Sequence, residues 1–305
     1  MLHLRLIVPP DRTAAVRGLL TAEAGVTNLV ALPGAAQQPP GDVLLCDLAR
    51  EAANGVLDQL RGLGVERDGS IAIETVDVAL SDAAHRARRL APGHGSDAVV
   101  WEEISSVTHE EATLSWSYLL FLTVACALAA CGVVLDSPIL IVGAMVVGPE
   151  FGPLAGLCVG LVQRRPRVAW RSLLALVVGF PVAMAATVLF AWLMYGLGYF
   201  DPARLEAARP MTGFIYHPDA LSFVVAFLAG VAGTLSLTSA KSGALIGVLI
   251  SVTTVPAAAN AAVALAYGRF DQAVGSTGQL GLNLLGIVVA GLATLLVQRR
   301  VWRAR

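Results

Sequence analysis

From about residue 114 onward, the chain alternates long apolar stretches with short polar turns. Each stretch has about the 20 residues that a helix needs to cross the hydrocarbon core of a bilayer. The pattern therefore predicts a multi-span α-helical membrane domain over residues 114–298. We place six spans at Leu114–Leu135, Ser137–Val162, Ser172–Gly196, Ala220–Ala240, Ser242–Tyr267 and Ala273–Val297.

Basic residues gather in alternate turns of this pattern. Four arginines lie in Gln163–Arg171, between the second and third spans, and four more lie in the tail 299–305. Because cytoplasmic loops are enriched in Lys and Arg, we predict a multi-pass protein of the cell membrane with both termini in the cytoplasm. The N-terminus lacks a basic segment followed by an apolar one and a cleavage site, so we expect no signal peptide.

In residues 1–80 the apolar positions form shorter segments than in the membrane part. Alternating apolar positions predict strands, and helical spacing predicts helices, in the order strand, helix, strand, strand, helix, strand. This is the order of a ferredoxin-like α+β domain. It carries no Gly-rich phosphate loop, so we interpret it as a cytoplasmic regulatory or assembly module. The strands are expected at 2–8, 26–32, 42–48 and 70–80, the helices at 11–22 and 51–63, and a turn at 33–41.

Residues 81–113 connect the two domains. The segment 81–97 is basic and then rich in Gly and Pro, which predicts a mobile linker. The segment 99–115 carries acidic residues at helical spacing. This spacing predicts an amphipathic connector helix that leads into the first span.

Composition agrees with a membrane protein: 56% of the residues are hydrophobic, 14% are charged, and the mean hydropathy is +0.70. A net charge of −1, without a basic stripe, argues against nucleic acid as a partner. The four cysteines have no metal-ligand spacing, and the spans carry neither a His/Asp/Glu set nor a Ser/His pair. We therefore expect no metal, no cofactor and no enzymatic activity.

The second and fifth spans are interrupted near their middle. The second contains two Gly-Pro pairs around the charged residue Glu150, and the fifth contains Pro256. A carboxylate at membrane depth is costly and is normally kept for a function. Two interrupted segments at matching places in two halves point to a transporter site. With three spans in each half, related halves would be inverted relative to each other.

We therefore predict that the two breaks form one transport or ion site near the membrane midplane. Its candidate residues are Gly148, Pro149, Glu150, Gly152 and Pro153 in the second span, Ser251, Thr253, Thr254, Pro256 and Asn260 in the fifth, and Asn283 in the sixth.

Two alternatives stay open within this prediction. The prolines could only kink packed helices, and Asn283 could hydrogen-bond across helices instead of facing a cavity. Asp136, at a turn between the first two spans, is interpreted as a helix cap at the membrane interface.

Three segments resemble a known family: GAMVVGPEFGPLAGLCVGLV, SGALIGVLISVTTVPAAANAAVALAYG and QLGLNLLGIVVA. They resemble the bacterial and archaeal membrane family called domain of unknown function 389, over about Leu114–Val297. Two positions depart from the family's pattern, which has an apolar residue where this chain has Glu150 and a second proline where it has Ala257. The resemblance implies the fold and topology, and the family name confers no activity.

Two functions follow as expectations. The first is a transporter or channel for a small solute or ion. The second is a membrane-anchored sensor or scaffold, whose ferredoxin-like domain binds a ligand or partner. A plain anchor needs neither paired breaks nor a carboxylate within a span, which favours the first. The expected partners are the lipid bilayer, an unknown small solute or ion, and further copies of the chain in a homo-oligomer.

Overall fold

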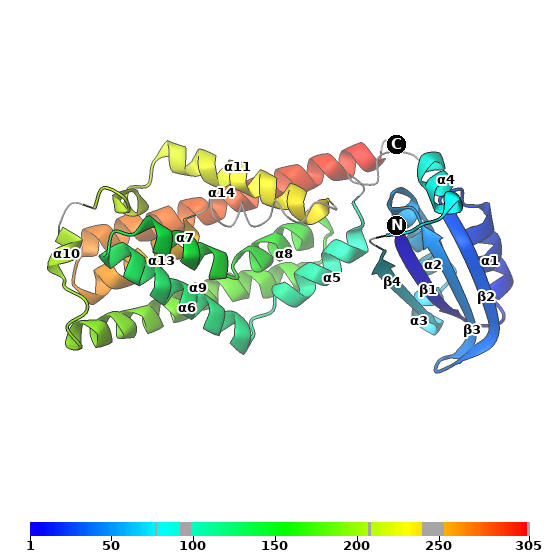
Figure 1. Ribbon diagram of the computed structural model, residues 1–305, viewed down its shortest axis with the longest axis horizontal. Coiled ribbons are helices and arrows are strands. Elements are labelled where there is room, and N and C mark those ends of the chain that lie inside the picture. The colour runs from blue at the N-terminus through cyan, green and yellow to red at the C-terminus, as the bar shows by residue number, and fades with distance from the viewer. Residues whose placement is uncertain (77, 92–98, 207–208, 240–252, 304–305) are drawn as a thin grey trace. The chain divides into compact units, whose positions relative to one another are not determined.

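The computed structural model describes the chain except residues 77, 92–98, 207–208, 240–252 and 304–305 (Figure 1). The described chain divides into two compact units, an N-terminal unit of Met1–Trp101 and a helical unit that begins at Glu102. The N-terminal unit thus includes the helix that follows the predicted boundary after residue 80 and the described residues up to Trp101.

The N-terminal unit is a four-stranded antiparallel sheet with helices. The strands lie in the order β2-β3-β1-β4, so that β1 pairs with both β3 and β4. The order of elements is the predicted one of a split β-α-β arrangement. The elements are β1 (Leu2–Val8), α1 (Thr13–Ala22), β2 (Val26–Gln37), β3 (Pro40–Leu48), η1 (Arg50–Ala52), α2 (Ala53–Gly62), α3 (Val65–Asp68) and β4 (Ser70–Thr75).

Two strand limits differ from the sequence prediction. Most of the segment 33–41, predicted as a turn, belongs to strands β2 and β3, which pair with each other. Pro33 is tolerated there because β2 is an edge strand, where a missing N–H breaks no ladder on the open side. A register shift between Leu32 and Ala36 accompanies it. Strand β4 ends at Thr75, five residues earlier than predicted.

The core of this unit follows from the period of its strands. Alternate residues of β1 are fully buried, and they pack against the buried face of α2. The core residues include Leu2, Leu4, Leu6, Val8, Val16, Leu20, Leu44, Leu48, Val56, Leu57 and Leu60.

Part of the predicted mobile linker is ordered. Residues Asp82–Leu90 form α4, whose N-terminus is capped by the Ser81 hydroxyl. Farther along, the side chain of Asn54 binds the chain at two points, donating to the Val99 carbonyl at 2.8 Å and accepting from the Trp101 N–H at 3.3 Å. The Gly- and Pro-rich residues 92–98 lie outside the described residues.

Arg12 and Asp68 give this unit a predictable response to acid. Hydrogen bonds from Arg67 and Arg12 lower the pKa of Asp68 to about 2. In the unfolded chain the pKa of an aspartate is about 3.9. The native state therefore binds fewer protons, and the stabilisation that is present above pH 4 is lost as the pH falls toward 2.

We expect a fragment of residues 1–101 to unfold cooperatively in urea, with a midpoint that falls between pH 4 and pH 2. In the variant Asp68→Asn that fall is shallower, because one of the shifted carboxyls is gone. Circular dichroism at a series of pH values measures it. Equal pH dependence in both proteins would contradict the assignment to Asp68.

The helical unit contains four described helices that are long and apolar enough to cross a membrane, or five if the bent pair α7 and α8 is one span. The described residues thus account for four or five of the six predicted spans. The elements are α5 (Trp101–Glu111), α6 (Trp116–Val134), α7 (Pro138–Val147), α8 (Phe151–Val162), α9 (Pro166–Gly196), α10 (Ala203–Glu206), η3 (Gly213–Tyr216), α11 (Ala220–Thr238), α13 (Thr254–Ala266) and α14 (Phe270–Arg303).

The predicted fifth span, Ser242–Tyr267, lies partly outside the described residues. Its described part is α13, which has 13 residues. At 1.5 Å per residue, such a helix is about 20 Å long and does not cross a hydrocarbon core of about 30 Å. All side chains from Thr254 to Ala264 are buried, so α13 is enclosed by other helices. It packs against α6, α9 and α14.

Basic residues predicted for a loop and a tail extend helices. Helix α9 begins at Pro166, so Arg167 and Arg171 belong to its first two turns. Proline fits the first helical position because the N–H there has no intrahelical partner. Helix α14 continues through Arg299 and Arg300 to Arg303. Arginine is a good helix former, and its long stem lets the charge reach an interface.

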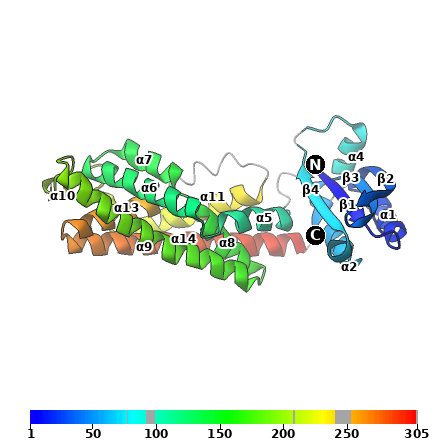
Figure 2. The ribbon, with the colours of Figure 1, turned by 90° about the horizontal axis from the view of Figure 1, so that it is seen from below.

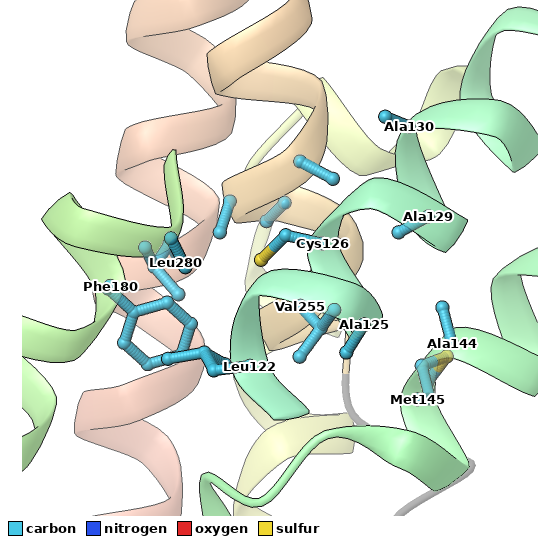
Figure 3. Packing of buried hydrophobic residues seen from close by; sticks show 14 of the residues in the cluster. Leu122, Ala125, Cys126, Ala129, Ala130, Ala144, Met145, Phe180, Val255 and Leu280 are labelled. Atoms are coloured by element: carbon cyan, nitrogen blue, oxygen red, sulfur yellow. The ribbon is translucent and has the colours of Figure 1, made fainter. Parts of the chain in front are cut away.

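The core of the helical unit is made mostly by alanines and branched aliphatic side chains from several helices, together with a few aromatic ones. Figure 3 shows Leu122 and Cys126 of α6, Phe180 of α9 and Leu280 of α14 in one cluster with Val255 of α13. Helices α6, α9 and α14 run lengthwise through this unit in both views (Figures 1 and 2). The element α10 lies at the end of the unit away from α5.

Candidate functional site

The N-termini of two short helices, α8 and α13, meet inside the helical unit. Helices α7 and α8 are bent by 49° at the break between Val147 and Phe151, and Glu150 is the N-cap residue of α8. Thr254, the first residue of α13, donates a hydrogen bond from Oγ1 to Glu150 Oε1 at 2.6 Å. Residues 104 positions apart in the chain thus form one buried polar pair.

Two of the three prolines of this region occupy equivalent positions in their helices. Pro153 is the third residue of α8, and Pro256 is the third residue of α13. In the first turn an N–H has no intrahelical acceptor, so proline is accommodated there. The break itself is at Gly148–Glu150 and contains Pro149.

Glu150 is almost completely enclosed, with 4% of its surface exposed. Its second oxygen, Oε2, has no hydrogen-bond partner among the residues that the structure describes. Gly148 leaves room for this carboxylate, because a Cβ atom there would meet Glu150 Oε2 and would lie 2.8 Å from Val255. The positive ends of α8 and α13 both favour a negative group at this place.

A second polar chain runs from the other side of the α13 N-terminus. Asn283 of α14 donates from Nδ2 to Thr253 Oγ1 at 2.9 Å, and Gln279 donates from Nε2 to Asn283 Oδ1 at 3.4 Å. Gln279 Oε1 has no partner among the described residues, although the side chain is only 2% exposed. These three side chains lie along a cavity of about 430 Å³.

The cavity has the size of a small-molecule site and leads inward from a surface loop. Its outer wall comes from residues 211–222, and its inner wall includes Thr253, Gln279 and Asn283. Since Thr253 is bonded in sequence to Thr254, the inner end of the cavity lies next to the residue that binds Glu150.

Asn260, predicted to belong to the same site, binds elsewhere. Its side chain accepts from Arg209 Nη1 at 2.9 Å and donates to Ser276 Oγ at 2.6 Å. Arg209 also donates to Gln272 Oε1 at 2.8 Å, and its guanidinium lies 5.0 Å from the centre of the Tyr216 ring. We call these residues the Arg209 cluster. Its member in α13, Asn260, lies six residues after Thr254.

The structure thus brings together only part of the predicted set. Glu150, Thr254, Thr253 and Asn283 are linked directly or through adjacent residues, and Asn283 both hydrogen-bonds across helices and lines a cavity. Gly152 is buried inside the first turn of α8. Ser251 lies outside the described residues.

Asp136 is not the N-cap of α7, which is Ser137, but it lies in the turn that ends α6. It has a positive φ of 49° at the turn before α7, and its carboxylate accepts from the backbone of Met211 and Thr212 at 3.3 and 2.9 Å. The Thr212 hydroxyl donates to it as well, at 2.8 Å. Asp136 therefore holds the loop that forms the outer wall of the cavity.

Sequence reasoning missed Gln279 and Arg209. Gln279 precedes Asn283 by four residues, a spacing that puts both on one face of a helix, so this signal was available. Arg209 donates hydrogen bonds to the neutral amide side chains of Asn260 in α13 and Gln272 in α14. Loop sequence carries no signal for such long-range pairing.

Groups of three or more His, Cys, Asp or Glu side chains that could hold a metal ion do not occur in the described part of the chain.

Comparison with known proteins finds a family model that matches part of the helical unit. Residues 145–289 match the family model "Domain of unknown function (DUF389)". The chain is 24% identical over 200 residues to "Uncharacterized protein MJ0678" of Methanocaldococcus jannaschii, over 65% of this chain and 58% of that relative. The chain thus spans less than two thirds of this relative's length. No solved structure matches. The resemblance seen in the sequence is confirmed, because the family match and the archaeal relative support membership of this chain in the DUF389 family.

Proposed function

We propose that this chain is a transporter or channel for a small solute or ion, and that its pathway passes the Glu150–Thr254 pair. The hydrogen bond of 2.6 Å between the N-termini of two half-length helices is the observation that carries the proposal. A buried carboxylate is costly in a membrane protein, and the free oxygen of Glu150 offers a site for a proton or a cation.

The arrangement of the helices supports six spans in two inverted halves. Helices α6 and α11 have 19 residues each, and α9 and α14 have 31 and 34. In each half a short helix with proline as its third residue lies between the two long ones. Interrupted helices at matching places of two halves are typical of secondary transporters.

The basic ends of α9 and α14 support an orientation with both termini in the cytoplasm of the cell membrane. In that orientation the loop 211–222, and with it the mouth of the cavity, faces outward. A membrane-anchored sensor would leave the buried polar pair and the cavity without a role, so we favour transport.

Flux in proteoliposomes tests the proposal. The full-length protein is reconstituted, and uptake of Na⁺, K⁺, protons and short alkylammonium ions is compared with uptake in protein-free vesicles. At least one of these is expected to enter only with the protein present. No protein-dependent flux of any of them, in vesicles with correctly folded protein, would overturn the proposal.

We expect Thr254→Val to lower that flux about tenfold, because a hydrogen bond to a charged group contributes roughly 1.5–3 kcal/mol and 1.4 kcal/mol is a factor of ten. The matched control is Thr277→Val on α14, whose hydroxyl donates to the Ala273 carbonyl of its own helix at 2.8 Å. Equal flux in both variants would show that Thr254 lies outside the pathway.

A further inference from the structure

The cavity beside α13 is apolar along its walls and polar at its inner end. Its walls are aliphatic and aromatic, and its inner end carries Thr253, Gln279 and Asn283. A site of this kind fits a ligand with a short apolar body and one polar head group. The apolar lining residues are Pro138, Ile141, Val142, Met145, Met211, Phe214, Leu221, Val225 and Ala226.

The inner end of the cavity includes Gln279, a buried amide whose hydrogen bonds are incomplete among the described residues. The donation from Asn283 to Thr253 and the donation from Gln279 to Asn283 orient both amides, and Gln279 Oε1 then has no partner among the residues that the structure describes. An enclosed acceptor of this kind costs free energy until a donor reaches it. The head group of the ligand must therefore be a donor.

Charges around the cavity favour a positive head group over a neutral one. Asp219 lines the mouth, whereas Asp136 does not line the cavity and binds the backbone of Met211 and Thr212 in the outer wall. The positive end of α13, which would attract an anion, already faces the carboxylate of Glu150. The nearby cation Arg209 does not line the cavity, and its hydrogen bonds go to Asn260 and Gln272.

We propose that this cavity binds a small organic cation, a primary ammonium on a short apolar chain, with its N–H groups directed to Gln279 Oε1. This inference rests on the proposed function, since it names the substrate class of the same pathway. The ammonium group supplies the missing donors, and the apolar chain lies against the walls near Met145 and Val225. Thr253 lines the cavity and its neighbour Thr254 binds Glu150, so the bound cation lies close to the Glu150–Thr254 pair.

Binding to the detergent-solubilised full-length protein tests the proposal without requiring transport. Isothermal titration is carried out with n-butylammonium chloride, n-butanol and sodium butyrate, which share the apolar chain and differ in charge. We expect n-butylammonium to bind at least tenfold more tightly than the other two. Equal or tighter binding of butanol or butyrate would overturn the proposal.

Two variants place the binding in this cavity. Gln279→Met keeps the volume but removes the acceptor, and we expect it to weaken n-butylammonium binding about tenfold. Val225→Trp fills the cavity from a side chain that is 41% exposed, without changing a buried polar group, and is expected to abolish binding. Thr277→Val is the control that retains binding. If Val225→Trp binds like the unmodified protein, the cavity is not the site, whether or not Gln279→Met folds.

Flux measurements separate this inference from the proposed function. Binding of n-butylammonium that depends on Gln279 and Val225, in a protein without any flux, would support the cavity assignment and overturn transport. Flux of an inorganic ion that both variants leave unchanged, without n-butylammonium binding, would support transport and overturn the organic-cation site.

Discussion

Flux through this protein is expected to fall tenfold to a hundredfold when Glu150 is replaced by glutamine. The glutamine side chain has nearly the same shape and can still accept the hydrogen bond from Thr254, but it removes the negative charge at the meeting point of α8 and α13. A hydrogen bond to a charged group contributes roughly 1.5–3 kcal/mol, and a loss of this size corresponds to a tenfold to hundredfold lower rate.

Uptake into proteoliposomes, normalised to the amount of reconstituted protein, measures the effect. Asp271→Asn is the charge-matched control, because it neutralises an exposed carboxylate in the first turn of α14. The loss is expected at every pH at which the unmodified protein transports. If Glu150→Gln transports like the control, with the same pH dependence, Glu150 has no role in the pathway.

The second large effect is expected from Arg209→Met, which should lower the stability of the helical unit by about 3 kcal/mol. Methionine fills part of the space of the arginine stem but leaves the acceptors Asn260 Oδ1 and Gln272 Oε1 without their donors. Each buried unsatisfied group costs roughly 1–3 kcal/mol, and the cation–π contact with Tyr216 is lost as well. Removal of the buried charge offsets only part of this cost.

A thermal transition of the detergent-solubilised protein, followed by circular dichroism, should shift down by roughly 5–10 °C. The control Arg204→Met removes an exposed arginine of α10 and is expected to shift it by much less. In the double variant Arg209→Met with Gln272→Met, one orphaned acceptor disappears, so the two effects should be less than additive. Additive effects would contradict the contact between Arg209 and Gln272.

The apolar period of the chain was enough to locate most of its helices. The predicted spans Leu114–Leu135 and Ala220–Ala240 agree with α6 and α11 within two residues at each end, because the polar turns on both sides limit where an apolar helix can end. The β-α-β-β-α-β order of the N-terminal unit was equally predictable from strand and helix periods. Helix limits failed where arginines extend α9 and α14 beyond their apolar parts, since arginine suits both a helix and a basic loop.

For the candidate site, the sequence by itself determined which residue is exceptional and where the chain breaks. Glu150 is conspicuous in an apolar run, and the prolines beside it predict irregular backbone. Only the tertiary structure decided what Glu150 contacts. Its partner Thr254 is 104 residues away, and Thr253 and Asn260 differ from it by one and six positions yet have different partners. Helical rotation turns neighbouring positions toward different helices, and the packing of α13 against α6, α9 and α14 fixes which helix each one meets.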